Sequence, residues 1–486
     1  MKQKSIKKNY IYNLIYQILV VIIPLITAPY LARVLGVEGV GIYSYTLSNV
    51  SYFILAANIG IASFGQREIA MHRDDRKKTT KIFWDLYSYQ LIIGYISIAL
   101  YVTYALLFSK YSLFQGVLTI NLLAAVIDCT WLFQGLEEYK SISIRNILTK
   151  LFFTLAIFFF VHTPDDLVIY IILNGASCML SATIMWASYK KVADRRPKLR
   201  EIQAFKYWKD TIMYFLPQIA VQIYTVLDKT MLGLITGSQI ENGYYEQSYR
   251  ITSIVMTLIT SLNIVVAPRM AYLYKKGSIA EIKDRLAKSL YFVFMLSVPM
   301  TLGLIAVGPA FSQWFYGPGY EKVQTLMPIC APIIFIITMS NCLGIQCLLP
   351  CGKRVQNAIA LWIGAGLNLV ANLILIPHFA SIGAAIGTII AESAITIMFV
   401  IFSRKYLSFS KILKGFKNYL IAGAVMFVAL LFTRHYLPQP TVVNTLIQTG
   451  AGVVIYGVTL LCTRDVFLYD NIRIIGNKLG LIKKKG

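Results

Sequence analysis

The sequence predicts an all-α integral membrane protein with fourteen transmembrane helices, arranged as two six-helix bundles in parallel repeat plus two C-terminal helices. Three observations predict this class: the composition, the number of long apolar segments, and a later repetition of the first seventy or so residues. Of the 486 residues, 57% are hydrophobic and 14% are charged, whereas about a quarter of a soluble domain is charged. We therefore expect most of the chain to lie in a lipid bilayer.

Fourteen segments reach the length of about twenty mainly apolar residues that a membrane-spanning helix needs. They are residues 10–32, 42–64, 83–107, 113–134, 144–161, 167–189, 211–235, 245–268, 288–312, 325–349, 354–377, 382–403, 416–436 and 442–462. Lys and Arg are retained on the cytoplasmic side of a membrane. If the amino terminus lies inside, about 40 of the 46 basic residues fall in inside segments. Both termini are therefore expected in the cytoplasm.

A stretch near residue 230 repeats the pattern of the start of the chain. Each copy has an apolar segment, a cation near its end, a turn that contains glycine, a second apolar segment and an arginine at its exit. Gly41 corresponds to Gly243 and Arg67 to Arg269, and both pairs are 202 positions apart. Six predicted spans separate the copies, so the duplication is expected to be parallel, related by an axis along the membrane normal.

The repeat divides the chain into five predicted regions. Residues 1–189 form an N-terminal six-helix bundle, 190–210 a basic cytoplasmic linker, 211–403 a C-terminal six-helix bundle, 404–462 two additional transmembrane helices, and 463–486 a basic cytoplasmic tail. The tail mixes isoleucine and leucine with lysine, a composition that favours a position along the membrane surface.

The composition disfavours several classes of function. The net charge is +24, but the basic residues form short groups between apolar runs rather than the single patch that nucleic-acid binding needs. None of the seven cysteines forms a CxxC pair, so nothing indicates a disulfide framework or a metal site. The sequence has no Walker A pattern for nucleotide hydrolysis. We expect a protein that is not an enzyme, needs no cofactor and binds no nucleic acid.

Ionisable side chains within apolar segments are candidate functional residues, because charge in the hydrocarbon region is costly. Glu392 lies about halfway along the span 382–403, where a desolvated carboxylate could exchange a proton or hold a cation. The alternative is a hydrogen-bonded glutamate that joins two helices. Asp128 has the same two interpretations, as a coupling residue or as a polar anchor.

Four charged residues lie close together at the start of the second copy. Asp228 and Lys229 are adjacent, and Glu246 and Arg250 lie one helical turn apart at the outer end of the next span. They form either a structural ion-pair cluster or a binding site, in which the two cations attract an anion and the carboxylates orient them. Arginine suits phosphate, because its planar guanidinium can donate two parallel hydrogen bonds. Arg33 occupies the corresponding position in the first copy.

Three further arginines, Arg67, Arg145 and Arg269, are candidates for a cytoplasmic entrance. Arg67 and Arg269 lie at predicted inside ends of helices, where they first of all set the orientation. They are also placed to receive an anionic substrate from the cytoplasmic leaflet.

The order and spacing of several short motifs resemble those of the polysaccharide repeat-unit flippases, within the multidrug/oligosaccharidyl-lipid/polysaccharide exporter superfamily. The motifs are PYLARVLG at 29–36 with GIY at 41–43, GQREIA at 65–70, QGLE at 134–137 with IRN at 144–146, and DKTMLG at 228–233. The resemblance covers nearly the whole chain. One departure concerns the lipid II flippases of this superfamily, which have a charged residue deeper in the first helix, whereas residues 11–32 have none.

The resemblance implies a V-shaped pair of helical bundles around a central cavity that opens alternately to each side of the bacterial cytoplasmic membrane. The expected cargo is an oligosaccharide repeat unit on a polyprenyl pyrophosphate, moved from the inner to the outer leaflet for O-antigen, capsule or exopolysaccharide assembly. Cavity cations hold the pyrophosphate in that family, a role that Arg33, Lys229 and Arg250 match. The last two helices are expected to help form a groove for the lipid tail, and other polysaccharide assembly proteins are expected partners.

Net transport needs a driving force, and we expect coupling to a proton or sodium gradient through Glu392 or Asp128. Two other functions stay open. A multidrug cation antiporter of the same fold would favour carboxylates over cations in its cavity. A membrane saccharide polymerase or ligase would place acid, base or cation groups on sizeable outer loops, and the predicted outer loops are short.

Overall fold

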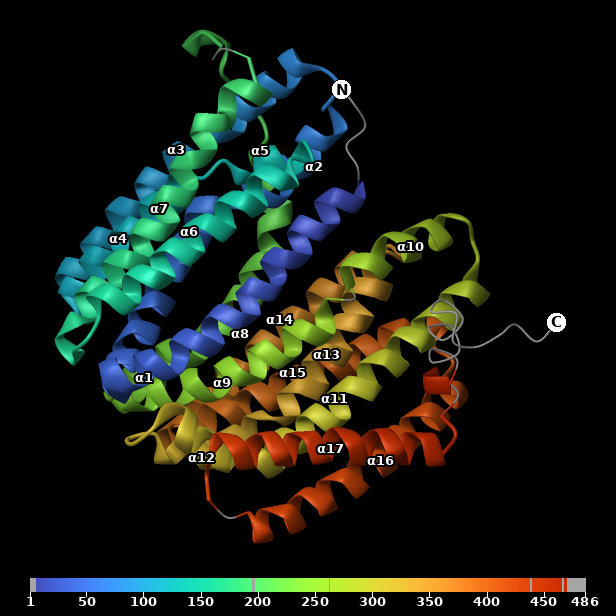
Figure 1. The fold of residues 1–486 in the computed structure, drawn as a ribbon. Coiled ribbons are helices and arrows are strands. Elements are labelled where there is room, and N and C mark those ends of the chain that lie inside the picture. Colours follow the sequence, from blue (N-terminus) through green and yellow to red (C-terminus); the bar gives the residue numbers. More distant parts are fainter. Residues whose placement is uncertain (1–5, 195–196, 262, 438, 466, 470–486) are drawn as a thin grey trace. The chain divides into compact units, whose positions relative to one another are not determined.

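The described part of the chain is almost entirely helical. A computed structural model describes residues 6–194, 197–261, 263–437, 439–465 and 467–469 (Figure 1). These residues form helices and no β-strand. Eleven segments among them are long and apolar enough to cross a membrane. The chain is therefore a multi-pass, all-α membrane protein, as the composition predicts.

The packing divides the chain into two compact units, Met1–Gly243 and Tyr244–Gly486. The first unit contains α1 (Ile6–Asn58), α2 (Ile61–Met71), α3 (Arg76–Leu107), α4 (Ser112–Ile127), α5 (Thr130–Gly135), α6 (Tyr139–Phe160), α7 (Leu167–Val192) and α8 (Trp208–Thr236). Helix α9 (Gln239–Thr260) begins in the first unit and continues in the second. The five regions predicted above follow the sequence repeat rather than the packing, and their boundaries stay a prediction.

The second unit contains the remaining long helices. They are α10 (Asn263–Lys275), α11 (Ile279–Tyr316), α12 (Glu321–Cys330), α13 (Pro332–Leu343), α14 (Arg354–Phe379), α15 (Ser381–Ser403), α16 (Phe409–Tyr436) and α17 (Val442–Cys462). Four short elements complete the description: the 3-10 helices η1 (Pro164–Asp166), η2 (Leu199–Glu201) and η4 (Arg404–Tyr406), and the π-helical turn η3 (Gly344–Leu348). The predicted tail 463–486 lies mostly outside the described residues.

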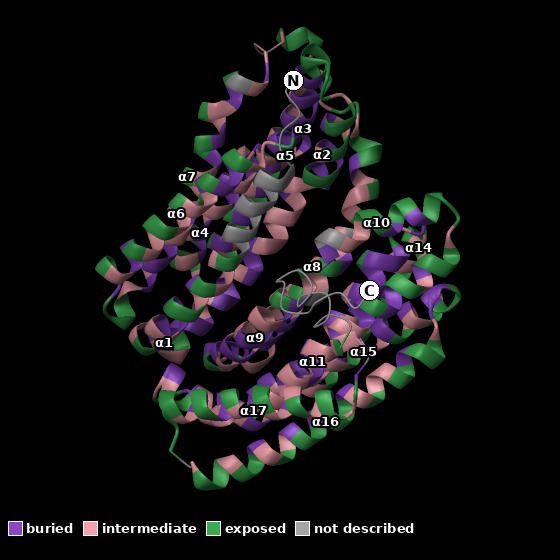
Figure 2. Ribbon diagram, turned by 45° about the vertical axis from the view of Figure 1, so that its right-hand side comes forward, coloured by how far each residue is buried: buried purple, intermediate pink, exposed green. Residues whose placement is uncertain are grey.

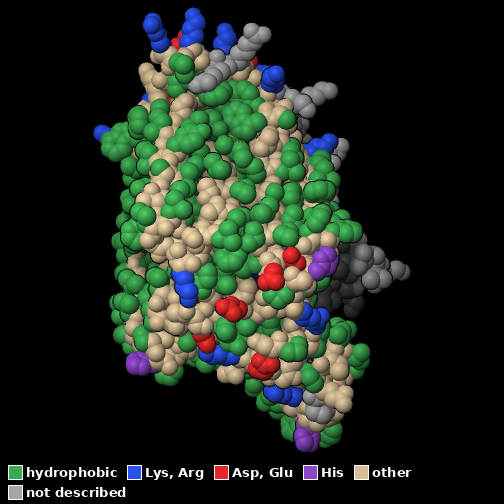
Figure 3. Space-filling model, turned by 90° about the vertical axis from the view of Figure 1, so that its left-hand side faces the viewer, with side chains coloured by type: hydrophobic (Ala, Val, Ile, Leu, Met, Phe, Trp, Pro, Cys, Tyr) green, Lys and Arg blue, Asp and Glu red, His purple; other side chains and the backbone are tan. Residues whose placement is uncertain are grey.

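Each unit is a helical bundle. Apolar side chains are buried between its helices, and other large apolar side chains are exposed on its surface. In the first unit α1 packs against α3, α4, α6 and α8, and in the second α14 packs on α15 while α11 contacts α12, α13, α16 and α17. Buried and exposed residues alternate along the helices in Figure 2. Leu106, Phe159, Leu373 and Phe432 are all more than half exposed. Hydrophobic side chains dominate the middle of the face in Figure 3, and a group of Lys and Arg side chains lies at one end. Such a surface suits a lipid environment.

The first two predicted spans are two helices that meet at a kink at Gly36, within the range Ile6–Asn58. Gly36 has φ 67° and ψ 175°, a conformation that glycine adopts without strain. The helix resumes at once, so the predicted turn between residues 32 and 42 is reduced to this residue. The second span also ends earlier than predicted, at Asn58. Gly60, with φ 76°, separates α1 from α2 and lies so close to α8 that a Cβ atom would be 2.3 Å from the Thr211 carbonyl oxygen.

Three other predicted spans are interrupted as well. The span 113–134 breaks between α4 and α5, the span 245–268 between α9 and α10, and the span 325–349 between α12 and α13. Helices α8 and α9 cover two predicted spans but do not belong to the eleven segments that meet the length and hydropathy criteria among the described residues. The exact number of fourteen stays a prediction.

Candidate functional site

The two copies of the sequence repeat meet in a reciprocal backbone contact. Gly41 in α1 lies so close to Gln239 that a Cβ atom would be 1.7 Å from the Gln239 carbonyl oxygen. Gly243 in α9 lies similarly close to Val37, where the corresponding distance is 2.1 Å. The offset of 202 residues that relates the glycines also relates Val37 to Gln239. Each copy therefore contacts the other in the same way, and a side chain at either glycine would push the backbones apart.

The predicted cation Lys229 lies on α8 beside a row of hydroxyl groups that joins α8 to α1. Thr230 Oγ1 is 3.0 Å from Ser48 Oγ and 3.3 Å from the Tyr52 hydroxyl oxygen. The side chain of Asp228 is buried, and that of Lys229 is half-buried. These contacts fix the part of α8 that carries both charges.

Arg33 lies on α1, three residues before the interruption at Gly36, and is exposed. It belongs to the same unit as Lys229 but to a different helix. The two cations are 196 positions apart, so they do not share the offset of 202 residues that relates the glycines. Their joint action on one anion stays a prediction.

Glu246 and Arg250 pair with one another on α9, as their spacing of one turn predicts. Arg250 Nη2 is 2.8 Å from Glu246 Oε1, and the side chains are 22% and 15% exposed. The Tyr316 hydroxyl donates to the Gln247 carbonyl at 2.9 Å, which holds the end of α11 against this turn. Pairs at this spacing stabilise helices, but a guanidinium has five N–H donors. The pair alone does not decide between a structural and a binding role.

Asp128 and Arg145 are connected through Thr130. Asp128 Oδ1 accepts hydrogen bonds from the Thr130 hydroxyl at 2.5 Å and from its backbone N–H at 3.3 Å. Arg145 Nη1 donates to the same hydroxyl oxygen and to the Ser181 carbonyl, each at 3.1 Å. Arg145 is buried, at 8% exposed. This arrangement favours the interpretation of Asp128 as a polar anchor that ties α5, α6 and α7 together.

The interruption at Asp128 is filled by side chains that satisfy the backbone. Gln90 Nε2 lies 3.2, 3.0 and 2.9 Å from the carbonyl oxygens of residues 125, 126 and 128. Gln90 Oε1 accepts from the Trp131 indole at 3.1 Å, and the Trp186 indole donates to the Ile127 carbonyl at 2.8 Å. Carbonyls that lose their helical partners at the break are therefore hydrogen-bonded within the first unit.

Glu392 lies in the buried face of α15. It is 3% exposed, and Thr388 lies one turn earlier on the same helix. Thr388 Oγ1 is 3.1 Å from the Tyr245 hydroxyl oxygen, which brings α9 against this face within the second unit. Glu392 is therefore part of a buried polar region rather than of a lipid-facing surface.

The packing of α14 on α15 adds two asparagines to this region. Cβ atoms placed on Gly364 and Gly387 would meet the side chains of Ile395 and Asn372, at 2.4 and 2.3 Å. This antiparallel register sets Asn368 opposite residue 391, beside Glu392. Both asparagines are buried. Sequence reasoning did not select them because it considered only charged residues.

Arg67 and Arg269 are exposed at helix positions near the predicted cytoplasmic ends. Arg67 Nη1 donates to the Tyr214 hydroxyl of α8 at 2.8 Å. The Arg269 guanidinium lies over the Tyr272 ring, 5.1 Å from its centroid. Both cations have one aromatic neighbour and remain accessible, which is compatible with either role predicted for them.

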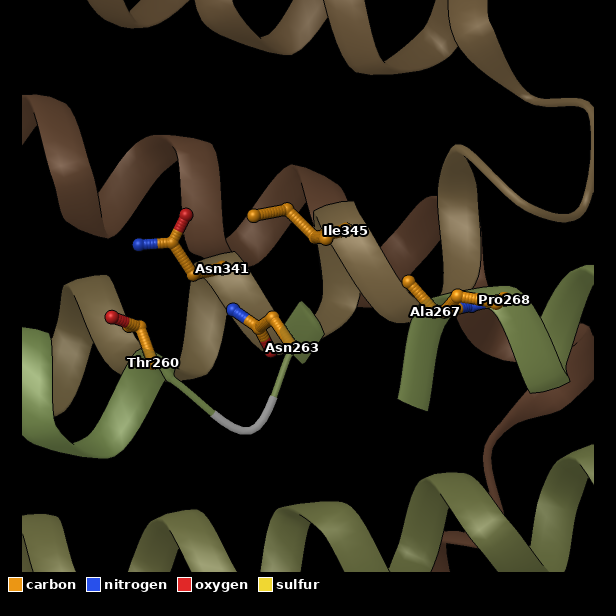
Figure 4. Close-up of a pocket in the computed structure, with 6 residues that line it drawn as sticks. All are labelled: Thr260, Asn263, Ala267, Pro268, Asn341 and Ile345. Carbon is orange, nitrogen blue, oxygen red and sulfur yellow. The ribbon is translucent and has the colours of Figure 1, made fainter. Parts of the chain in front are cut away.

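Sequence reasoning missed a cavity of about 480 Å³ in the second unit. Its described lining consists of Thr260, Asn263, Ala267, Pro268, Asn341 and Ile345 (Figure 4). None of these side chains is charged, so the search for intramembrane charges passed over them. The available signal was a pair of asparagines within the predicted spans 245–268 and 325–349.

Residues 6–274 match the family described as polysaccharide biosynthesis protein, which is more than half of the chain. The chain belongs to this family. The resemblance to the polysaccharide flippases that the sequence motifs indicate is therefore confirmed.

Relatives of the chain carry the names of transporters and flippases. A protein of Escherichia coli strain K12 that carries the name of an O-antigen transporter is 26% identical over 412 residues, covering 82% of this chain and 97% of that protein. A protein of Haloferax volcanii that is named as a flippase is 23% identical over 265 residues, covering 53% of this chain and 54% of that protein.

Solved structures share the fold. The lipid II flippase MurJ in an inward closed conformation has a TM-score of 0.73 at 15% identity, covering 94% of this chain and 99% of that chain. An inward-facing multidrug resistance MATE family transporter of the MOP superfamily has a TM-score of 0.61 at 13% identity, covering 86% and 97%. The family member described here thus has the fold of this superfamily, as predicted.

Proposed function

We propose that the protein moves a polyprenyl-pyrophosphate-linked oligosaccharide repeat unit from the inner to the outer leaflet of the bacterial cytoplasmic membrane by alternating access. Family membership and the names of the O-antigen transporter and flippase relatives support the cargo class. The structural observation that carries the proposal is the placement of the cations Arg33 and Lys229 on α1 and α8, two helices that pack on each other.

The cargo has two polar parts that hydrocarbon excludes, a pyrophosphate and a row of sugar hydroxyls. Each unsatisfied polar group costs several kcal/mol in an apolar medium. In this proposal Arg33 and Lys229 hold the pyrophosphate, Asp228 orients Lys229, and the Glu246–Arg250 pair supplies a third cation. Arg67 and Arg269 receive the anionic head group at the cytoplasmic side. Both termini lie in the cytoplasm, and other polysaccharide assembly proteins supply and consume the repeat unit.

The driving force is proposed to be a proton or sodium gradient. Glu392 is the stronger coupling candidate, because it is buried in α15 beside other polar residues. We expect Glu392→Gln to uncouple outward transport from the gradient in proteoliposomes, while binding of the cargo persists. If dissipating both ion gradients leaves the rate and extent of transport by the wild-type protein unchanged, gradient coupling is excluded.

Genetic complementation tests the proposed cargo and cation sites together. A strain that lacks its own repeat-unit flippase receives the wild-type gene, Arg33→Ala, Lys229→Ala or the control Lys110→Ala, an exposed cation between α3 and α4. We expect the wild-type and control genes to restore polysaccharide export and each site variant to reduce it at least tenfold, about the value of one charged hydrogen-bonded contact. Normal export by both site variants at normal protein levels would remove the proposed phosphate site.

A second candidate function, a multidrug cation antiporter, is favoured by one observation, the burial of the carboxylates Asp228 and Glu392. It is less well supported because Arg33 and Lys229 would repel a cationic drug. Drug-susceptibility tests of an expressing strain separate the two functions: the flippase proposal expects no protection, and protection that requires Glu392 would favour the antiporter.

A further inference from the structure

The cavity of about 480 Å³ lies where two helical segments of the second unit lose their regular form. Helix α9 ends at Thr260 and α10 begins at Asn263, so the predicted span 245–268 is discontinuous. On the opposite wall α13 continues into the π-helical turn η3. Irregular backbone at membrane depth is tolerated where protein buries it or where it lines a cavity. Discontinuous helices and π-helical turns recur at substrate sites.

Amide groups at this cavity have hydrogen-bonding capacity that the described chain does not use. The side-chain amide of Asn341 has no hydrogen-bond partner among the described residues. Asn263 Oδ1 accepts from Gln346 Nε2 at 2.6 Å, and the Asn263 amide nitrogen has no hydrogen-bond acceptor among the described residues. Gln346 Oε1 is buried and lacks a partner within the described part of the chain. Asn341 is half-buried and Asn263 is buried, so their amides are placed to hydrogen-bond a polar group that enters the cavity.

The uncharged polar and apolar residues that line the cavity suit a neutral ligand with several hydroxyl groups. Thr260, Asn263 and Asn341 lie at one end of the cavity in Figure 4, and Ala267 and Pro268 lie at the other, with Ile345 between them. Amides can both donate to and accept from hydroxyl groups, and the apolar residues can cover the C–H face of a ring. An anionic group would find no cation in the described lining. The volume lies in the range of small-molecule sites.

We propose that this cavity binds a sugar ring of the transported lipid-linked oligosaccharide, with Asn263 and Asn341 hydrogen-bonded to its hydroxyl groups. The inference rests on the proposed function and assigns a separate place to the saccharide, apart from the cations that hold the pyrophosphate. The two spans that form the cavity have their predicted cytoplasmic ends here, so the site would engage the saccharide early in the transport cycle.

Native mass spectrometry of the purified full-length protein tests the site with two competing probes. One is undecaprenyl pyrophosphate, and the other is the lipid-linked repeat unit extracted from a host strain in which the gene is deleted. We expect the wild-type protein to prefer the sugar-bearing lipid and Asn341→Ala to lose that preference by about fivefold or more, the value of one to two neutral hydrogen bonds. Binding of undecaprenyl pyrophosphate should not change.

Two further variants keep the test decisive. Thr260→Val preserves shape and removes one hydroxyl, and it should reduce the preference less than Asn341→Ala does. Asn444→Ala removes an amide on α17 that donates to the Gln439 carbonyl, and it should leave the preference intact. An unchanged preference in Asn341→Ala, or equal binding of both lipids by the wild-type protein, overturns the saccharide site alone. Failure of the wild-type protein to bind either lipid overturns the proposed function as well.

Discussion

Two interrupted spans, one in each unit, differ in what lies beside the break. Between α4 and α5, Gln90 and Trp186 fill the gap and bond to carbonyls of residues 125–128. Between α9 and α10, the gap borders a cavity of about 480 Å³, and Asn341 on the facing wall has no hydrogen-bond partner among the described residues. Side chains that bond to the carbonyls at a break stabilise one arrangement of the chain. An amide that faces a cavity beside a break can instead form hydrogen bonds to a ligand. Removal of single side chains can test this difference.

The largest effect is expected from Gln90→Leu. This change leaves up to three carbonyls and the Trp131 indole without their side-chain partner. Several lost hydrogen bonds in a buried site should lower the free energy of unfolding by about 3 kcal/mol or more. Thermal unfolding of the purified protein in detergent measures the change. Gln218→Leu, which removes one hydrogen bond to Ser63, is the matched control, and an equal loss in both variants would show that the filled gap contributes nothing special.

An intermediate effect is expected from Trp186→Phe. The phenyl ring keeps much of the packing against Phe83 and Tyr87 but cannot donate to the Ile127 carbonyl. We expect a loss of about 1 to 2 kcal/mol in the free energy of unfolding, by the same measurement. Trp362→Phe, at a residue 42% exposed in α14, should change stability little. Equal stability of the two variants would contradict a structural role for the indole N–H.

The smallest effect on stability is expected from Asn341→Ala, because the side chain makes no hydrogen bond within the described residues. The free energy of unfolding should change by no more than about 0.5 kcal/mol. A loss as large as that of Gln90→Leu would mean that the amide is structural and that both interruptions are filled. Asn341→Ala should therefore change the preference for the sugar-bearing lipid but not the stability in detergent.

The reciprocal glycine contact is one feature of the fold that agrees with a pattern in the sequence. Apolar length and the asymmetry of Lys and Arg predict a multi-pass helical protein, and an offset of 202 residues predicts a duplication. Gly41 and Gly243 meet their partners at that same offset. The helix interruptions could not be predicted, because hydropathy averages over a window while a break depends on a distant partner. Gln90, for example, lies more than thirty positions before the gap that it fills.

In the candidate site, the sequence predicted only those side-chain interactions whose two residues are close in the sequence. The Glu246–Arg250 pair follows from a spacing of one turn. The link from Asp128 through Thr130 to Arg145 depends on contacts between different helices, so the sequence left Asp128 open between two roles. The asparagines of the cavity were overlooked because neutral amides do not stand out as charges do in an apolar span. They stand out only when the hydrogen-bond partners of each amide are examined in the structure.

The most direct test of the central claim locates the lipid-linked repeat units in the native host. With the gene deleted, they should accumulate on the cytoplasmic face of the membrane, where periodate added to intact spheroplasts cannot oxidise their sugars. Restoring the gene should make them accessible again, and restoring Lys229→Ala should not. If periodate oxidises the repeat units equally in the deletion strain and the wild type, the protein is not the flippase of this cargo.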